Sequence, residues 1–202
     1  PLIRQTQINL KAGVTFATGL RSILRQDPDI IMVGEIRDQE TAEIAIHAAL
    51  TGHLVLSTLH TNDAVGAVAR LLDMDIESYL LASTLLGVVA QRLTRRICVH
   101  CQEGSRPDAA LRARYPELTV AYRGRGCRLC RSSGYHGRLG VFELFPVDEA
   151  ARAMVAAKQP SDVLRQHAVS AGMRTLRADG LLKVQQGLTT LEELERVVPE
   201  LV

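Results

Sequence analysis

Two short runs of apolar residues, each followed at once by polar ones, constrain the fold of this chain most strongly. The first is Ile30–Val33, and the second lies within His53–Thr58. Runs this short and this continuous are typical of strands buried on both faces of a parallel sheet. Because segments with helical spacing lie before, between and after them, the sequence predicts an α/β fold built on a parallel sheet.

Spacing of apolar residues by three and four positions, together with capping residues, predicts four helices in the first half of the chain. They are expected at Thr15–Gln26, Asp38–Leu50, Asn62–Met74 and Ile76–Gln91, the last interrupted near Gly87. Asp38 is suited to cap the second helix and Asn62 the third, while Gly52 stands where a helix often ends in a left-handed residue.

The second half begins with a change of composition at Cys98. The segment from there to Cys130 is rich in Arg and Gly and poorly periodic, so it predicts a loop-rich region held by metal. A strand is expected at Gly140–Phe145, and helices follow it. They are expected at Asp148–Ala157, Ser161–Ala171 and Thr175–Gln186, with a capping box of Thr190 and Glu193 opening a last short helix.

These patterns divide the chain into three segments. Residues 1–97 form the α/β core, residues 98–132 the cysteine-containing region, and residues 133–202 a mainly helical region. No run of about 18 or more apolar residues occurs, and no secretory leader is visible.

Charge is distributed unevenly although the net charge is only +2. Between Arg92 and Arg138 there are 11 arginines against three acidic residues. This basic stretch is either a solvated surface or a contact surface for acidic lipid headgroups or an acidic protein. Aromatic residues make up only 3% of the chain, which argues against binding of single-stranded nucleic acid by base stacking.

Four cysteines occur in two CxxC pairs, Cys98 with Cys101 and Cys127 with Cys130. Two such pairs can deliver four thiolates to one tetrahedral ion, which predicts a structural Zn²⁺ with no open coordination position. Four reduced thiols, or a disulfide pair left after loss of the metal, are the alternatives. His100 and His136 lie nearby but are not expected to be ligands, because four cysteines already complete the shell.

A carboxylate follows the first strand, since Ile30–Val33 runs into Gly34 and Glu35. Ligands of open α/β sheets bind at the carboxyl ends of the strands. A fixed carboxylate there can orient an attacking water or hold Mg²⁺ indirectly during nucleotide hydrolysis. An ordinary strand ending in a polar turn is the alternative for this segment taken alone.

Hydroxyl and imidazole groups accompany the second strand. His53 stands at its start, whereas Ser57, Thr58 and His60 cluster at its end, near the edge that carries Glu35. Such a cluster can sense a terminal phosphate by hydrogen bonding, with Thr58 among the donors. For His53 a plain structural role remains equally open.

Arg21 and Arg25 lie four residues apart on one face of the first helix. They are either part of a solvated face or contacts to phosphate or to a neighbouring subunit, because guanidinium groups bind phosphate oxygens through two parallel hydrogen bonds.

Five stretches together resemble the type II secretion and type IV pilus assembly ATPase family. These are Gly19–Asp29, Val33–Asp38, Thr51–Asp63, Ala90–Leu93 and Gly134–Glu143. The second contains the family's Walker B acid and the third its His box. The resemblance covers nearly the whole chain and is strongest before residue 97.

The resemblance implies a role for each matching residue. Glu35 would be the catalytic Walker B acid, and His53 and His60 the His-box histidines, with His60 nearer the phosphate. Arg21 and Arg25 would relate the nucleotide state to the subunit interface. Residues 1–97 would then be part of a RecA-like P-loop ATPase core, with ATP and Mg²⁺ bound in the parent protein.

The family also implies partners and a location. Its members form rings, expected here to be hexameric, in the cytoplasm at the periphery of the bacterial inner membrane. The implied partners are inner-membrane platform proteins and acidic phospholipids, with no nucleic acid beyond ATP. The paired CxxC resembles the secretion and pilus-extension branches more than the retraction branch.

One family element, the Walker A loop GxxxxGK[ST], is not found in these 202 residues. The chain contains only Lys11, Lys158 and Lys183, and none of them follows a glycine. We therefore expect the parent protein to be an ATPase and this chain alone to be inactive. The start at Pro1 favours truncation over the alternative of a natural degenerate subunit.

Three function hypotheses remain at this point. The leading one is a motor ATPase subunit of type II secretion that couples ATP hydrolysis to pseudopilus assembly and export. Type IV pilus extension is its close alternative. The alternative of another class is a non-enzymatic zinc-ribbon binding or docking module, supported by the cysteines and the basic stretch.

Overall fold

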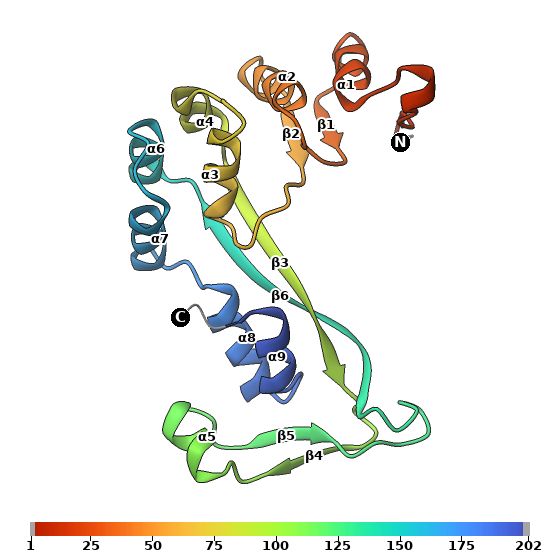
Figure 1. Ribbon diagram of the computed structural model, residues 1–202, viewed down its shortest axis with the longest axis vertical. Helices are drawn as coiled ribbons and strands as arrows, with labels where there is room; N and C mark the ends of the chain where they lie inside the picture. Colours follow the sequence, from red (N-terminus) through yellow and green to blue (C-terminus); the bar gives the residue numbers. More distant parts are fainter. Residues whose placement is uncertain (1–2, 200–202) are drawn as a thin grey trace. The chain divides into compact units, whose positions relative to one another are not determined.

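The computed structural model describes residues 3–199, which fold as two compact units (Figure 1). Unit 1 comprises the described residues up to Val88 together with Phe145–Ala171. Unit 2 comprises Val89–Leu144 together with the described residues from Gly172 onward. The predicted boundary at residue 97 lies inside unit 2, and the predicted segment 133–202 is shared between both units. Assigning separate roles to the three sequence segments stays a prediction.

Unit 1 alternates helices with two short strands. Its elements are η1 (Leu10–Ala12), α1 (Phe16–Leu24), β1 (Ile30–Val33), α2 (Gln39–Leu50), β2 (Leu54–Ser57), α3 (Gly66–Leu72), α4 (Ser78–Thr84), α6 (Glu149–Ala156) and α7 (Ser161–Ser170). Three of the helices begin where a capping side chain accepts from a free backbone N–H group. Thr15 caps α1, Asp38 caps α2 and Asp148 caps α6, and the sequence predicted the cap at Asp38.

The two strands of unit 1 pair in parallel, in register from Ile30 opposite Leu54 to Val33 opposite Ser57. The prediction that β1 is buried on both faces is wrong. Ile31 and Val33 are buried, but Ile30 is 61% exposed and Met32 76% exposed. Successive side chains of a strand point to opposite faces, and within residues 3–199 only one face of this strand pair is covered.

The helix predicted over Ile76–Gln91 is also wrong in its second half. Helix α4 ends at Thr84, Leu85 is already extended at φ −73° and ψ 117°, and β3 (Gly87–Ile97) follows. The run of valines after Gly87 favours a strand, and the strand pairs with β6 (Tyr135–Pro146). At Gly87 a side chain would meet the carbonyl oxygen of Phe145 at 3.1 Å, so glycine permits this close approach.

Helix α3 begins at Gly66 rather than directly after Asn62, with Val65 at its N-cap position. The Gly66 N–H donates to Asp63 Oδ1 at 2.7 Å. Residues between Thr58 and Val65 therefore form an extended turn after β2 instead of the first turn of a helix.

Unit 2 contains most of the β3–β6 strand pair, whose strands run in opposite directions, and a second, smaller strand pair. Its other elements are β4 (Gln102–Ser105), α5 (Ala109–Arg114), β5 (Ala121–Gly124), α8 (Leu176–Gln185) and α9 (Leu191–Val197). A buried cluster joins α5, α8 and α9, and consists of Tyr115, Leu118, Val184 and Leu194. The region predicted as loop-rich thus contains two strands and a helix.

Of the two hydrogen bonds in the capping box predicted at Thr190 and Glu193, one forms. Thr190 Oγ1 accepts from the Glu193 N–H at 3.2 Å. The Glu193 carboxylate does not accept from the N–H of Thr190, because it binds the backbone N–H and the guanidinium of Arg95 on β3.

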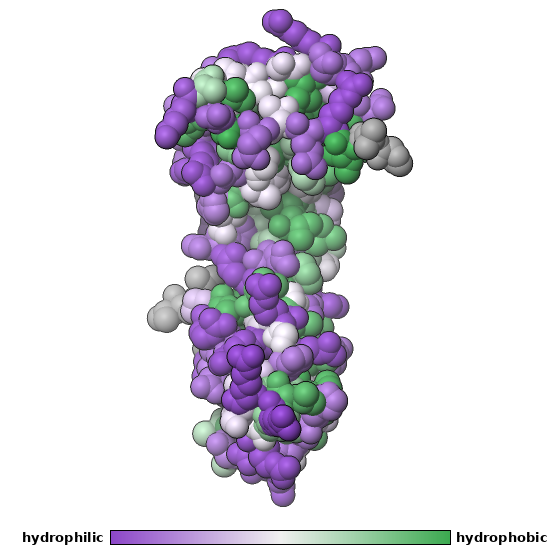
Figure 2. Space-filling view, turned by 90° about the vertical axis from the view of Figure 1, so that its right-hand side faces the viewer, coloured by the Kyte–Doolittle hydropathy of each residue, from purple (hydrophilic) through white to green (hydrophobic). Residues whose placement is uncertain are grey.

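Hydrophobic patches lie among hydrophilic surface in Figure 2. The exposed apolar residues of the β3–β6 strand pair are Val89, Leu93, Phe142 and Leu144.

Within residues 3–199, no helix is long and apolar enough to cross a lipid bilayer.

Candidate functional site

The carboxyl ends of β1 and β2 bring Glu35 and His60 together. The His60 Nε2 atom lies 3.3 Å from Glu35 Oε2. The two backbones stay joined beyond the strand ends, because the Ile36 N–H donates to the Thr58 carbonyl at 3.0 Å. Parallel strands end at one edge of a sheet, and this is why residues 25 positions apart in sequence meet here.

A third side chain, Arg37, completes this cluster and was not identified from the sequence. Its Nε lies 2.6 Å from the same Glu35 oxygen that faces His60. The hydrogen bond from Arg37, aided by His60, lowers the pKa of Glu35 below its ordinary value of 4.5 against the opposing effect of burial. Glu35 is therefore ionised at neutral pH. A basic residue two positions after a strand-end acid is the signal that could have identified Arg37.

The cluster is accessible from solvent. The Glu35 side chain keeps 21% of its surface exposed and the His60 side chain 82%. An ionised carboxylate beside an exposed imidazole can accept a hydrogen bond from a water molecule and orient it toward a bound electrophile.

Thr58 and His53 lie at opposite ends of the second strand. The Thr58 hydroxyl donates to the Gly34 carbonyl at 2.7 Å, so it fastens the end of β2 to the residue before Glu35. His53 precedes β2, with Nδ1 at 2.9 Å from the Ala48 carbonyl and 3.1 Å from Thr51 Oγ1. The structure thus brings Thr58 to the Glu35 cluster and leaves His53 at the far end of the strand.

Arg21 and Arg25 are both exposed, on α1 and at its C-terminal cap. Arg21 forms an ion pair with Glu40 of α2 at 2.8 Å, with both side chains more than half exposed. Among the described residues, neither arginine forms an ion pair with Glu35. Their predicted roles at phosphate or at a subunit interface stay predictions.

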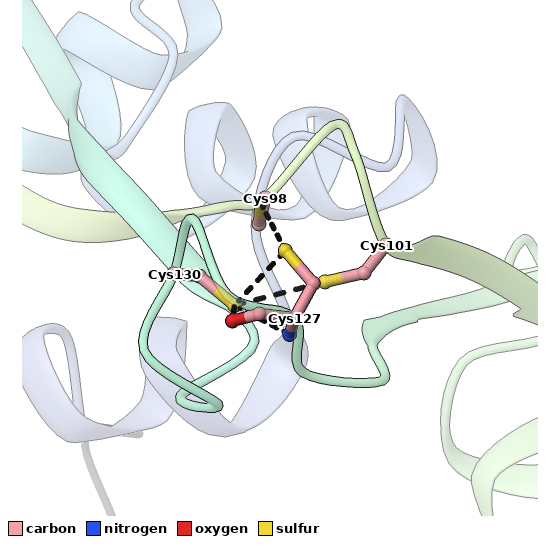
Figure 3. Close-up of side chains that lie close together, drawn as sticks. All are labelled: Cys98, Cys101, Cys127 and Cys130. Carbon is pink, nitrogen blue, oxygen red and sulfur yellow. Dashed lines mark hydrogen bonds between the residues drawn. The ribbon is translucent and has the colours of Figure 1, made fainter.

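In unit 2 the four cysteines converge from two separate loops (Figure 3). Cys98 and Cys101 follow β3, whereas Cys127 and Cys130 lie between β5 and β6. All four sulfur atoms lie within 4.8 Å of one another. This arrangement is the one expected of a pair of CxxC turns that share one ion.

The spacing of the sulfurs fits zinc. The Sγ atoms of Cys98 and Cys127 are 3.9 Å apart, those of Cys101 and Cys130 3.8 Å, and those of Cys127 and Cys130 3.7 Å. A regular tetrahedron with Zn–S bonds of about 2.3 Å has edges of about 3.8 Å. A disulfide would need a separation of about 2.05 Å, which none of these pairs approaches.

Two backbone N–H groups approach one of the four sulfurs. The Cys127 N–H lies 3.1 Å and the Gly134 N–H 3.3 Å from Cys130 Sγ. Burial raises the pKa of Cys130, but the backbone donors together with the Cys127 and Cys101 thiols lower it to about 6. Burial raises the pKa of Cys101 to about 12. The spacing of the four sulfurs, and not the pKa of one thiol, indicates that they can hold one Zn²⁺ in a closed shell that leaves no position for substrate.

The fold and the strand-end cluster together define the class of protein. The pilus retraction motor PilT, solved with bound ADP, superposes with a TM-score of 0.65 at 30% sequence identity, over 92% of this chain and 44% of that one. This similarity confirms the fold predicted from the sequence, the C-terminal part of a RecA-like ATPase domain, to which a cysteine-containing region and helices are added.

The family follows from the sequence comparisons. The type II/IV secretion system protein model matches residues 1–196, and this chain belongs to that family. Type II secretion system ATPase E of Vibrio cholerae is 51% identical, with 98% of this chain and 40% of the relative covered. Type IV pilus assembly ATPase PilB of Thermus thermophilus is 50% identical, with 96% and 22% covered. The chain thus spans two fifths or less of the length of these relatives.

Proposed function

We propose that this chain is the hydrolysis-side part of a motor ATPase subunit of type II secretion, which couples ATP hydrolysis to pseudopilus assembly and export. The contact between Glu35 and His60, at the ends of two parallel strands, is the observation that carries the proposal. Family membership supports ATP as the substrate, since the relatives reported above are named as ATPases.

In the proposed mechanism Glu35 orients the attacking water. Its ionised carboxylate accepts a hydrogen bond from the water, whose oxygen then attacks the terminal phosphorus of ATP while the bond to the bridging oxygen of ADP breaks. The remaining proton of the water passes to an oxygen of the released phosphate. His60, beside it, donates a hydrogen bond to the phosphoryl oxygens that gain charge. Bound Mg²⁺ would supply neutralisation of the phosphate charge. Thr58 holds the two strand ends in place through Gly34.

The remaining assignments follow from the family and are part of the proposal. Arg21 and Arg25, exposed on α1, would contact phosphate or a neighbouring subunit, and His53 would support the amino end of β2. The subunits would form a hexameric ring in the cytoplasm, at the inner membrane. The basic stretch of unit 2 would face platform proteins or acidic phospholipids.

The alternative within the family is type IV pilus extension. It is favoured by the PilB relative, whose identity of 50% nearly equals the 51% of the secretion ATPase. Complementation separates the two functions. Expression of the full-length protein in a strain lacking its own copy should restore export of secreted enzymes, whereas restoration of pili alone would support extension.

The test of the proposed chemistry is a Glu35→Gln substitution in the full-length protein. Turnover should fall by about 100- to 1,000-fold, because the water loses its orienting carboxylate, while ATP affinity changes less than about threefold. Glu43→Gln is a matched control, since Glu43 is an exposed residue of α2 whose carboxylate accepts from Gln39 Nε2 at 2.9 Å. Wild-type turnover in Glu35→Gln would refute the role of Glu35.

A further inference from the structure

The turn after β2 is held by an acidic residue that the proposed chemistry does not use. Asp63 lies three positions after His60, and its two carboxylate oxygens have separate partners. Oδ1 accepts from the N–H of Gly66, the first residue of α3, at 2.7 Å. Oδ2 accepts from Arg165 Nη2 at 2.8 Å. One side chain therefore connects the His60 turn both to α3 and to a residue 102 positions away.

Arg165 belongs to α7, a helix that is itself firmly packed. Leu164 and Ala168 of α7 are buried, and the helix contacts both α3 and α6. The Arg165 side chain is 30% exposed and that of Asp63 21%. An ion pair that is mostly shielded from water, and anchored on a rigid helix, restrains its partners more than an exposed surface pair does.

His60 needs such a restraint because packing does not supply one. Its side chain is 82% exposed, so the position of its imidazole depends on the backbone of the turn. Three residues span at most about 11 Å of extended chain, so a shift of Asp63 is readily passed to His60. The 3.3 Å contact between His60 and Glu35 therefore depends on where Asp63 is held.

We propose that Asp63 and Arg165 act as one positioning unit, which holds the His60 turn against Glu35 and ties the proposed hydrolysis site to α7. The inference rests on the proposed ATPase function and adds two residues that do not touch the reacting atoms. The ion pair also connects the His60 turn directly to α7.

The experiment is a set of substitutions in the full-length protein, each measured for kcat, KM, ATP affinity and thermal unfolding. Arg165→Gln removes the charge, and Asp63→Asn removes it while keeping an oxygen for the Gly66 N–H. Each should lower kcat about tenfold with ATP affinity nearly unchanged, because displacement of a reacting group by about 1 Å costs up to about 100-fold. Arg165→Lys, which can still pair with Asp63, should recover most of the loss.

The double variant tests whether the residues form a unit. Asp63→Asn combined with Arg165→Gln should be no slower than either single variant, since the same contact is lost in all three. Arg152→Gln is the matched control. Arg152 of α6 donates to the Ala82 carbonyl, so it joins a helix of the same unit to α4 without contacting the His60 turn. It should leave kcat unchanged.

Each other outcome contradicts the inference. Additive losses in the double variant, an equal loss of kcat in Arg152→Gln, or loss of ATP affinity in place of kcat would assign the pair a general structural role. Normal kcat in Arg165→Gln would overturn the inference while Glu35→Gln still abolishes turnover and the proposed function stands. No turnover by the wild-type protein would overturn the proposed function, and this inference with it.

Discussion

The two units of this protein each gather reactive side chains where strands end, but they present them to solvent in opposite ways. In unit 1, Glu35 and His60 meet at an edge that solvent reaches, with the Glu35 side chain 21% and the His60 side chain 82% exposed. In unit 2, Cys98, Cys101 and Cys130 are buried, and the sulfurs face one another. An accessible cluster can receive a substrate and water, whereas a closed tetrahedral shell has no place for either.

One ionised carboxylate in each unit shows the same difference in exposure to solvent. Arg37 lowers the pKa of Glu35 at a partly open site. Glu193 in unit 2 is only 1% exposed, and Arg95 and Arg196 more than offset its burial and lower its pKa to about 2. Both acids are ionised at neutral pH, but only the first can exchange partners with a ligand. The comparison teaches that ionisation alone does not mark a catalytic acid.

The largest expected effect is on the stability of the cysteine quartet, which we expect to depend on bound zinc. One zinc per chain is expected by elemental analysis. Chelation, or Cys98→Ser with Cys101→Ser, should remove on the order of 10 kcal/mol of folding free energy from the cysteine-containing region, residues 98–132. Hydrogen exchange should then show loss of protection around β4 and β5, while β1 and β2 stay protected. A metal-free chain with free thiols and unchanged protection would contradict a structural zinc site.

Loss of the buried carboxylate in unit 2 should have the next largest effect. Glu193→Gln removes charged hydrogen bonds to Arg95 and Arg196, whose side chains are 50% and 57% exposed and can be hydrated instead. The loss of stability should therefore be about 1 to 2 kcal/mol. Glu192→Gln, on the exposed side of α9, is the matched control and should cost less than about 0.5 kcal/mol. Equal unfolding midpoints for the two variants in denaturant would show that the Glu193 network adds nothing.

The pH dependence of this effect has a fixed sign. The pKa of Glu193 is lowered from 4.5 to about 2 in the folded chain. Its contribution is complete above the unfolded value of 4.5 and is lost as the pH falls through the folded value of about 2. The difference in stability between wild type and Glu193→Gln should therefore shrink over that range. A difference that is constant with pH would contradict the assigned pKa.

Local patterns were sufficient to predict much of unit 1. The four apolar residues of β1, the Asp38 cap of α2 and the run that becomes β2 each act within a few positions of sequence. Once two parallel strands are assigned, the meeting of Glu35 and His60 follows from sheet geometry. Their chemical roles do not follow from geometry and stay predictions.

Unit 2 was predicted less well because its decisive contacts are non-local. Strands β3 and β6 pair although about 40 residues of sequence separate them. The sequence analysis assigned the start of β3 to a helix. Glu193 matched a capping box, but its carboxylate instead binds Arg95, 98 positions away. The cysteines were the exception, because each CxxC pair is a local motif whose spacing alone indicates metal binding.

The smallest expected effect compares the two histidines of unit 1, which the family resemblance groups together. His60→Ala should lower kcat by about 10- to 100-fold, because a donor beside Glu35 is lost. His53→Ala removes only the contacts of His53 Nδ1 with Ala48 and Thr51, at the other end of β2. It should leave kcat within about twofold and lower stability by about 1 kcal/mol. Turnover by the full-length protein and its thermal unfolding measure both quantities. Equal losses of kcat in the two variants would contradict this comparison. They would mean that both ends of β2 contribute to hydrolysis, and not only the carboxyl end that carries Glu35 and His60.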